Sequence, residues 1–272
     1  MAIKQLDELG QKIFEQRYAY PGEKSYADRC KVIARHISSA EADDDKEKFF
    51  SKFYDILNTG DFVPGGRILF GSGRNKQNML NCYCLEPSDN VESIGKLISD
   101  TYRISCGGGG IGYNFSKIRP KGDDIQNIKH SAPGSVSVMQ MINEIGNHVR
   151  AGKNRRTALI AILNITHPDI LEFLKVKLDL GELNNFNISV GVTDKFIEAC
   201  ENGEDWYFTF NNRKYYVYHL VRVGKDEKTD ISCIGLNEED AIERAKAHYK
   251  VHPDDTFEDA MTPGTRHKKP AV

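Results

Sequence analysis

Two cysteines and a run of glycines are the residues in this sequence best suited to chemistry. Cys82 and Cys84 lie two positions apart, and Cys106 is followed by four consecutive glycines at residues 107–110. A thiolate can attack as a nucleophile or give up electrons in forming a disulfide. A glycine run carries no side chains, so a ligand or another stretch of backbone can approach it closely. Thiol chemistry beside bare backbone is therefore the first functional hypothesis.

Each of these features also has a structural explanation, and the sequence leaves both open. A free cysteine is most often a small buried hydrophobe, and this applies to Cys82 on a predicted strand. The glycines at 107–112 also fit a tight turn with close backbone packing. They follow a predicted helix and match neither G-x-G-x-x-G nor G-x-x-x-x-G-K-[ST], so a dinucleotide fold and a P-loop are not supported.

Basic residues in predicted loops form a second group of candidates. They are Arg119, Lys121, Lys153, Arg155 and Arg156. Loop cations are usually solvated, but arginines just before a buried strand also bind phosphate groups through paired hydrogen bonds. The histidines have no metal-like spacing and no two cysteines are in C-x-x-C spacing, so we predict no metal site.

A strand and a helix must position the cysteine pair and the acidic residues that follow it. Residues 80–85 read as a strand, on which the period of two puts Cys82 and Cys84 on the same side. The two are too close along the chain to form an unstrained disulfide with each other easily. Asp89 and Glu92 fit a capping box, with Asp89 as the cap of a helix over residues 91–105.

The rest of the chain predicts an α/β architecture behind a helical region. Residues 1–60 contain three amphipathic helical segments, the last of which stops at Gly60. Extended segments are predicted at 80–85, 111–118, 158–165 and 185–192, and helices begin near residues 91, 131, 169 and 194. Such alternation is typical of parallel strands. The continuous apolar run at 158–165 is typical of a strand covered on both faces.

Past residue 202 the pattern changes to short strands of antiparallel style and a helix capped at Asn237. We therefore expect four parts in the chain. They are a helical region at 1–60, an α/β region at 61–210, a small ββα appendage at 211–250 and a flexible tail at 251–272.

Composition bounds the class of protein. The 272 residues are 39% hydrophobic and 28% charged with a formal net charge of −2, which is soluble globular composition. Nucleic acids and anionic membranes attract basic proteins, so neither is an expected partner. No apolar run approaches the ~20 residues that span a bilayer. The N-terminal residues show no signal-peptide core, so we expect a cytoplasmic protein in which the six cysteines are small buried hydrophobes by default.

Several motifs follow one another in a particular order. They are Pro-Gly-Gly-Arg-Ile at 64–68, Asn-Cys-Tyr-Cys-Leu at 81–85, Asp-Asn-Val-Glu-Ser-Ile at 89–94, the glycine-rich segment 108–122, Ser-Ala-Pro-Gly-Ser-Val-Ser at 131–137, Arg-Arg at 155–156, His-Pro-Asp-Ile at 167–170 and Asn-Phe-Asn-Ile-Ser-Val at 185–190. Each is modest alone, and the ordered set is specific. Over residues 10–210 the chain resembles the large catalytic subunit of ribonucleotide reductase, most closely the adenosylcobalamin-dependent (class II) type.

The resemblance implies a fold, a reaction and roles for individual residues. The fold is a ten-stranded α/β barrel built from two five-stranded halves, of which this chain matches the first. The reaction is the reduction of a ribonucleotide's 2′-hydroxyl by a thiyl radical, which makes DNA precursors. Cys82 matches the strand cysteine that supplies reducing equivalents beside the substrate and becomes half of a disulfide. Asn81, Gly109 and Gly110 match substrate-binding positions.

The resemblance also implies an allosteric effector site and further small-molecule partners. Asp89 and Arg119 match residues that hold the dNTP or ATP effector. Arg155 and Arg156 lie in what resembles the loop that carries the effector's signal to the substrate. Adenosylcobalamin as cofactor, a ribonucleoside di- or triphosphate as substrate and a thioredoxin-like reductant are implied in the same way.

The sequence also departs from the family pattern. The family's Asn-Pro-Cys-x-Glu motif, which carries the radical cysteine, is absent from the 272 residues. The second redox cysteine, the partner of Cys82, is also expected outside this chain. Gln126 stands where the family has another effector-binding basic residue, no ATP-binding cone precedes the helices, and Cys84 has no assigned role.

From these departures we expect the N-terminal part of a reductase, inactive by itself. Its expected partner is the C-terminal half of the enzyme or a second copy of the chain. Two alternatives stay open: a non-catalytic, deoxynucleotide-binding regulatory fragment, and a fragment of a class I-type large subunit.

Overall fold

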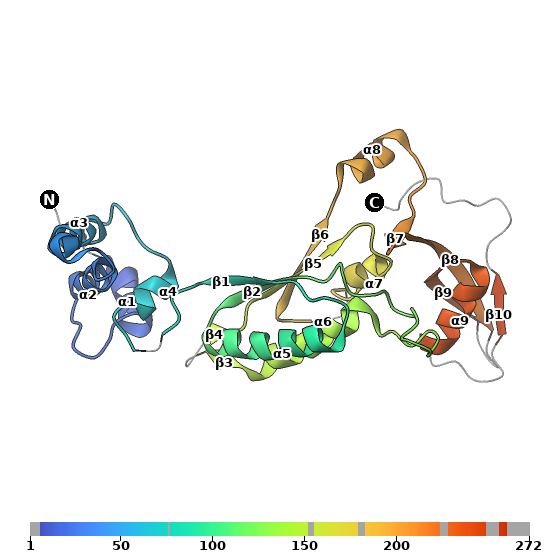
Figure 1. Ribbon diagram of the computed structural model, residues 1–272, viewed down its shortest axis with the longest axis horizontal. Coiled ribbons are helices and arrows are strands. Elements are labelled where there is room, and N and C mark those ends of the chain that lie inside the picture. The colour runs from blue at the N-terminus through green and yellow to red at the C-terminus, as the bar shows by residue number, and fades with distance from the viewer. Residues whose placement is uncertain are drawn as a thin grey trace. The chain divides into compact units, whose positions relative to one another are not determined.

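A computed structural model describes residues 6–75, 77–151, 155–178, 183–223, 228–248 and 256–259. The chain divides into two compact units, which comprise Met1–Tyr83 with Cys106–Gly110 and Cys84–Ser105 with Ile111–Val272. We call the first the helical unit and the second the α/β unit (Figure 1).

Four helices form most of the helical unit. They are α1 (Glu8–Arg17), α2 (Tyr26–Ser38), α3 (Lys46–Thr59) and α4 (Gly66–Gly71). Ser25 and Asp28 form a reciprocal capping box at the start of α2, and Gly60 ends α3 in the left-handed conformation, with φ of 76°. The three predicted helices are thus confirmed. The sequence analysis missed α4, because adjacent glycines at 65–66 indicate a turn.

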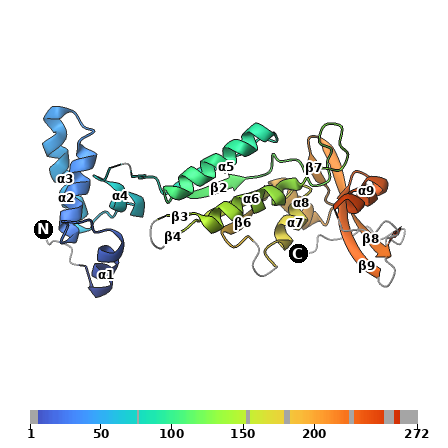
Figure 2. The same ribbon diagram turned by 90° about the horizontal axis from the view of Figure 1, so that it is seen from below.

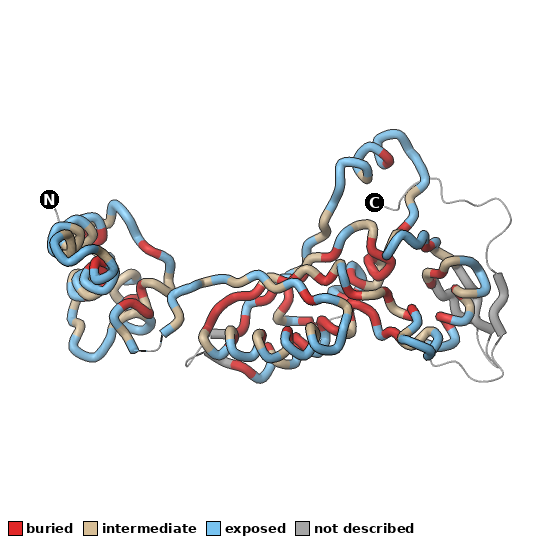
Figure 3. Tube along the Cα trace, viewed as in Figure 1, coloured by how far each residue is buried: buried red, intermediate tan, exposed pale blue. Residues whose placement is uncertain are grey.

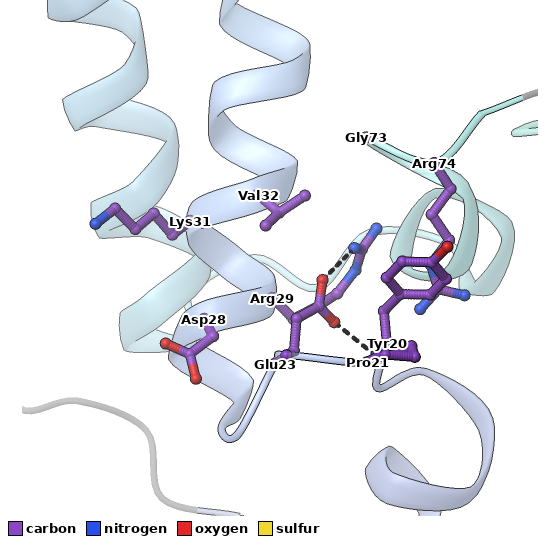
Figure 4. A pocket seen from close by; sticks show the side chains of 10 residues that line it. Tyr20, Pro21, Glu23, Asp28, Arg29, Lys31, Val32, Gly73 and Arg74 are labelled. Carbon is purple, nitrogen blue, oxygen red and sulfur yellow. Dashed lines mark hydrogen bonds and ion pairs between the residues drawn. The ribbon is translucent and has the colours of Figure 1, made fainter.

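A cavity of about 400 Å³ lies in the helical unit between α2, the turn that precedes it and the turn that follows α4. Figure 4 shows Glu23 between Arg29 and the backbone of Tyr20. Arg29 is only 1% exposed, forms an ion pair of 2.7 Å with Glu23 and donates to the carbonyls of Leu69 and Ser72. A buried cation needs such full pairing, so we interpret this cluster as a structural staple.

The α/β unit is built around a four-stranded sheet with the order β1-β2-β5-β6. The strands are β1 (Cys82–Leu85), β2 (Gly110–Asn114), β5 (Leu159–Asn164) and β6 (Phe186–Gly191). The helices between and after them are α5 (Val91–Cys106), α6 (Gly134–His148), α7 (Ile170–Lys175) and α8 (Asp194–Asn202). β2 with β5 and β5 with β6 pair in parallel, which confirms the predicted architecture. A two-stranded ribbon, β3 (Arg150–Ala151) and β4 (Arg155–Arg156), precedes β5.

One face of this sheet is covered and the other is open within the described part of the chain. α5 and α6 lie along the covered face (Figures 1 and 2), where Leu97, Met139 and Tyr113 belong to one hydrophobic core. Burial alternates along β5, so Leu159 is 3% exposed and Ile160 is 37% exposed (Figure 3). The prediction that this strand is covered on both faces is therefore wrong for this chain.

Antiparallel strands and a helix follow, as predicted. They are β7 (Phe208–Phe210), β8 (Arg213–Val223), β9 (Lys228–Gly235), α9 (Glu238–His248) and β10 (Thr256–Asp259). Asn237 accepts from the backbone N–H of Asp240, which confirms the predicted cap of α9. β10 is a strand within the segment 251–272 that was predicted to be a flexible tail, and the rest of that segment lies outside the described residues. β10 pairs with residues 220–223 of β8, which also pair with β9, so the two strands lie on opposite edges of β8.

A buried carboxylate joins three segments of the α/β unit. Asp169 directly precedes α7, but its side chain makes no capping hydrogen bond to it. Its carboxylate accepts from the backbone N–H groups of Lys121 (2.9 Å) and Ser135 (2.8 Å) and from the Ser135 hydroxyl (2.9 Å). His167 accepts from the Asp169 N–H at Nδ1 and donates from Nε2 to the carbonyl of Ile118 at 2.8 Å. The His-Pro-Asp and Ser-Ala-Pro-Gly-Ser motifs are thus parts of one structural junction.

Candidate functional site

Asn81 connects the glycine run to α4 within the helical unit. Its carbonyl accepts from the N–H of Gly110 at 2.8 Å, and its side-chain oxygen accepts from the N–H of Arg67 at 3.1 Å. Asn81 therefore holds the start of α4 and the end of the glycine run together. Three of the residues proposed to bind substrate, Asn81, Cys82 and Gly110, are brought together here.

The glycine run is shaped by the side chain of Arg67. The Arg67 guanidinium donates to the carbonyl of Gly107. Gly108 has a φ of 72°, and a β-carbon there would lie 2.8 Å from an Arg67 nitrogen. The positive φ favours glycine at 108, and a β-carbon there would also displace the Arg67 guanidinium. Gly109 and Gly110 are buried as well, so the structural explanation of the run holds.

Cys82 is exposed on β1, beside Asn81. Exposure alternates along this strand, and Cys84 is exposed in the same register, which confirms that both face one side. The interpretation of Cys82 as a buried strand cysteine is wrong. A thiol that reacts with a substrate and later with a reductant must be accessible, and Cys82 meets that requirement.

The six thiols divide into two classes, which predicts their reactivity with an aromatic disulfide reagent. Cys30 and Cys233 are buried, and burial raises the pKa of each to about 11. At pH 8 their thiolate fraction is about one in a thousand. Cys82, Cys84, Cys106 and Cys200 are exposed, against the default expectation that all six are buried.

We expect four equivalents of thiol to react rapidly and two only after denaturation. Peptide mass mapping of the labelled chain identifies the sites, and all six should react in urea. Rapid labelling of Cys30, or protection of Cys82, contradicts the assignment.

Asp89 and Arg119 meet in the α/β unit at the carboxyl ends of β1 and β2. Arg119 Nε lies 2.7 Å from an Asp89 carboxylate oxygen, and Arg119 Nη1 donates to the carbonyl of Asp124 at 2.7 Å. The two side chains are 25% and 30% exposed, so a ligand can reach the pair. Arg119 is therefore an ordered cation rather than a solvated loop residue.

The predicted capping role of Asp89 is wrong. Asn90 caps α5 instead, since its side-chain oxygen accepts from the N–H of Ser93 at 2.8 Å. The opposite charge of Arg119 draws the Asp89 carboxylate away from the helix. Because Asn90 caps α5, the Asp89 carboxylate is not used by the helix and can accept a hydrogen bond from a ligand hydroxyl.

A second polar cluster at the same edge of the sheet was missed by the sequence analysis. Glu86 accepts from Lys117 at 2.7 Å and from the amide of Asn114 at 3.1 Å. Ligands of open parallel sheets bind outside the carboxyl ends of the strands. The signal available in the sequence was the position of Asn114 and Lys117, at the end of a strand and three residues after it.

Among the other basic candidates, Lys121 is the one whose side chain the structure describes. Arg155 and Arg156 form β4, and their side chains lie outside the described part of the chain, as does Lys153. Lys121 pairs with Glu172 at 3.2 Å. Gln126 has a φ of 53° on the loop that follows Arg119.

The described residues contain neither a metal site nor a membrane-spanning helix. No three His, Cys, Asp or Glu side chains among them are grouped to hold a metal ion. No described helix combines the length and the apolar character needed to cross a membrane.

Comparison with known proteins gives two successive matches to family models. Residues 4–77 match the ribonucleotide reductase all-alpha domain, and residues 80–255 match the ribonucleotide reductase barrel domain. The barrel match thus includes the whole of the segment 211–250 that was predicted to be an appendage.

Relatives include vitamin B12-dependent ribonucleoside-diphosphate reductases. The protein of Thermoplasma acidophilum is 36% identical over 175 residues, 64% of this chain and 23% of that protein. The protein of Mycobacterium tuberculosis is 33% identical over 172 residues, 62% of this chain and 25% of that protein. The ribonucleoside-diphosphate reductase subunit alpha of Bacillus subtilis is 25% identical over 212 residues, 75% of this chain and 30% of that protein.

The chain spans about a quarter of the length of the first two of these relatives. The barrel-domain match alone covers more than half of the chain, and the all-alpha match precedes it directly. The family expected from the ordered motifs is thereby confirmed. The chain belongs to the ribonucleotide reductase family.

Proposed function

We propose that this chain carries the reducing thiol and the effector-binding residues of an adenosylcobalamin-dependent ribonucleoside-diphosphate reductase that acts in the cytoplasm. The observation that carries the proposal is the exposed thiol of Cys82 next to Asn81, whose carbonyl holds Gly110. The diphosphate substrate and the cobalamin dependence rest on the names of the more similar relatives.

In this proposal Cys82 supplies one of the two thiols that reduce the ribose. The 2′-hydroxyl leaves as water, and the two thiols give up two electrons and become a disulfide. The second thiol and the radical-forming cysteine come from sequence outside these residues. A thioredoxin-like dithiol then reduces the disulfide for the next turnover.

The open face of the sheet supports the proposal that further strands, outside the described residues, complete the barrel. A ten-stranded barrel requires strands beyond the four in this sheet, and we assign them to the C-terminal half of the reductase or to a second copy of the chain. Ile160 and Asn187 are exposed on the face that a closed barrel buries.

Two cavities among the described residues bear on where a cofactor could bind. The cavity of about 400 Å³ is lined by α2 and its neighbouring turns, and one of about 300 Å³ is lined by α7, β8, β9 and α9. Neither is lined by Cys82, so we derive no step through the cofactor from this part of the protein.

Mixing the chain with a polypeptide that supplies the remainder of a B12-dependent relative tests the proposal. With adenosylcobalamin, a dithiol and a ribonucleoside diphosphate, we expect deoxynucleotide only when both polypeptides are present. The chain alone is expected to be inert, because it lacks the radical-forming motif. Product from the chain alone contradicts the proposal, and product without cobalamin favours a class I-type subunit.

The second candidate function is a non-catalytic, deoxynucleotide-binding regulatory fragment. The Asp89–Arg119 pair favours it, because that pair is assembled from residues of this chain alone. Deoxynucleotide binding without any complementation in the mixing experiment supports this candidate.

A further inference from the structure

A buried ion network joins the C-terminal segment to a loop of the α/β unit. Arg244 on α9 is 6% exposed and donates to Asp123 (2.7 Å), to Asp240 (2.7 Å) and to the carbonyl of Lys121 (3.0 Å). The hydroxyl of Tyr215 on β8, a fully buried residue, donates to the same Asp123 carboxylate at 3.0 Å. β8 and α9, about 90 and 120 residues beyond Asp123 in the sequence, therefore both bind the Asp123 carboxylate.

Asp123 belongs to the loop 119–131, which needs outside support to keep its conformation. Gln126 and His130 have φ values of 53° and 50°, in the left-handed region that non-glycine residues rarely adopt. Such residues persist when the surrounding structure holds them. A β-carbon on Gly122 would lie 2.9 Å from the Arg244 side chain, so the stem of Arg244 packs directly on this backbone.

The same loop presents Arg119. Asp124, the neighbour of Asp123, accepts from Arg119 through its carbonyl at 2.7 Å and from the His130 N–H through its carboxylate at 2.9 Å. Arg119 in turn reaches Asp89. A continuous set of contacts thus leads from Arg244 through Asp123 and Asp124 to the guanidinium of Arg119.

We propose that β8, β9 and α9 form a positioning arm for the effector site, with Arg244 as the positioning residue that fixes the loop 119–131 and so aims Arg119 at a nucleotide phosphate. The inference rests on the proposed effector role of Asp89 and Arg119. The physical cause is charge. Without Arg244, the buried Asp123 carboxylate and the partly buried Asp240 carboxylate lose their shared cation, and the loop loses this support. The arm touches no ligand, and it acts through the loop.

Binding of dATP, dGTP and dTTP to the intact chain, measured by calorimetry, tests the inference. We expect Arg119→Ala and Arg244→Met each to weaken binding by about tenfold or more, and Tyr215→Phe by about threefold. Tyr215→Phe removes only one hydroxyl, so it tests the arm even where Arg244→Met disturbs folding. Lys246→Met is the matched control, because Lys246 lies on the same helix in an exposed pair with Glu243.

Hydrogen exchange supplies a readout at the loop itself. The N–H of Gly122 donates to Ala132 and the N–H of Ala132 donates to Asp123, both at 2.9 Å. These amides should exchange faster in Arg244→Met and Tyr215→Phe, and Arg244→Lys should restore part of the protection. Amides of β5 should stay unchanged in all variants.

The outcomes separate this inference from the function on which it rests. If the unaltered chain binds none of the three nucleotides, the effector role falls and the inference falls with it. If binding is lost in Arg119→Ala but is unchanged in Arg244→Met and Tyr215→Phe, only the positioning role is overturned. Unchanged exchange of the loop amides overturns it as well.

Discussion

Asp169→Asn is expected to lower the free energy of unfolding of the α/β unit by about 3 kcal/mol. Asp169 is 6% exposed, and both of its oxygens accept, one from the Lys121 N–H and the other from the N–H and hydroxyl of Ser135. Asparagine keeps one acceptor oxygen and turns a donor toward the remaining N–H. A buried donor then stays unpaired, at a cost of about 1–3 kcal/mol, and the charge assistance of the other bonds is lost.

The single tryptophan makes this measurement specific to the α/β unit. Trp206 packs edge-on against Phe196 with ring centroids 5.0 Å apart, so its fluorescence in urea reports unfolding of that unit. Ser135→Ala removes only the hydroxyl bond, and we expect a loss of about 1 kcal/mol.

Asp194→Asn is the matched control for this experiment. Asp194 is an exposed aspartate on α8, and its replacement should change the stability by no more than about 0.5 kcal/mol. A loss smaller than about 1 kcal/mol in Asp169→Asn means that the junction is not what holds the three segments together.

The secondary structure of this protein could largely be read from periodicity and capping residues. α2 and α3 lie in the helical region predicted at 1–60, and Gly60 ends α3 as predicted. α5 ends within one residue of the predicted helix 91–105, because its apolar face repeats at helical spacing. The parallel strands β5 and β6 followed from apolar runs between helices. The sequence could not show what packs against each face of β5. An apolar strand has the same sequence pattern whether its second face packs against this chain or against other residues.

Side-chain partners distant in the sequence were beyond the reach of local patterns. Asp89 and Asn90 are adjacent residues of capping type, and Arg119, 30 residues away, decides which of them caps α5. Asp123 and Arg244 are 121 residues apart, so no spacing rule brings them together. The candidate thiol was found from the sequence, whereas its exposure and the role of Arg67 in shaping the glycine run needed the fold.

Cys82→Ser is expected to reduce multiple-turnover deoxynucleotide formation by about a thousandfold or more in the enzyme completed with its remaining sequence. A serine hydroxyl cannot give up electrons to form a disulfide, so the reduction of the ribose has no electron source at this position. Binding of deoxynucleotides should be unchanged, because the described partners of Arg119 are the Asp89 carboxylate and the Asp124 carbonyl, and the Cys82 thiol is not one of them. Steady-state product formation with a dithiol present is the measurement.

Cys84→Ser is the control that gives this experiment its meaning. Cys84 is exposed on the same strand and on the same side as Cys82, so it matches Cys82 in chemistry and accessibility and differs from it in position. Only Cys82 directly follows Asn81, which holds the glycine run through Gly110. If the reducing role depends on the position next to Asn81, the Cys84→Ser variant stays active. Equal loss in both variants assigns the chemistry to the pair, and full activity of Cys82→Ser removes this thiol from the reaction.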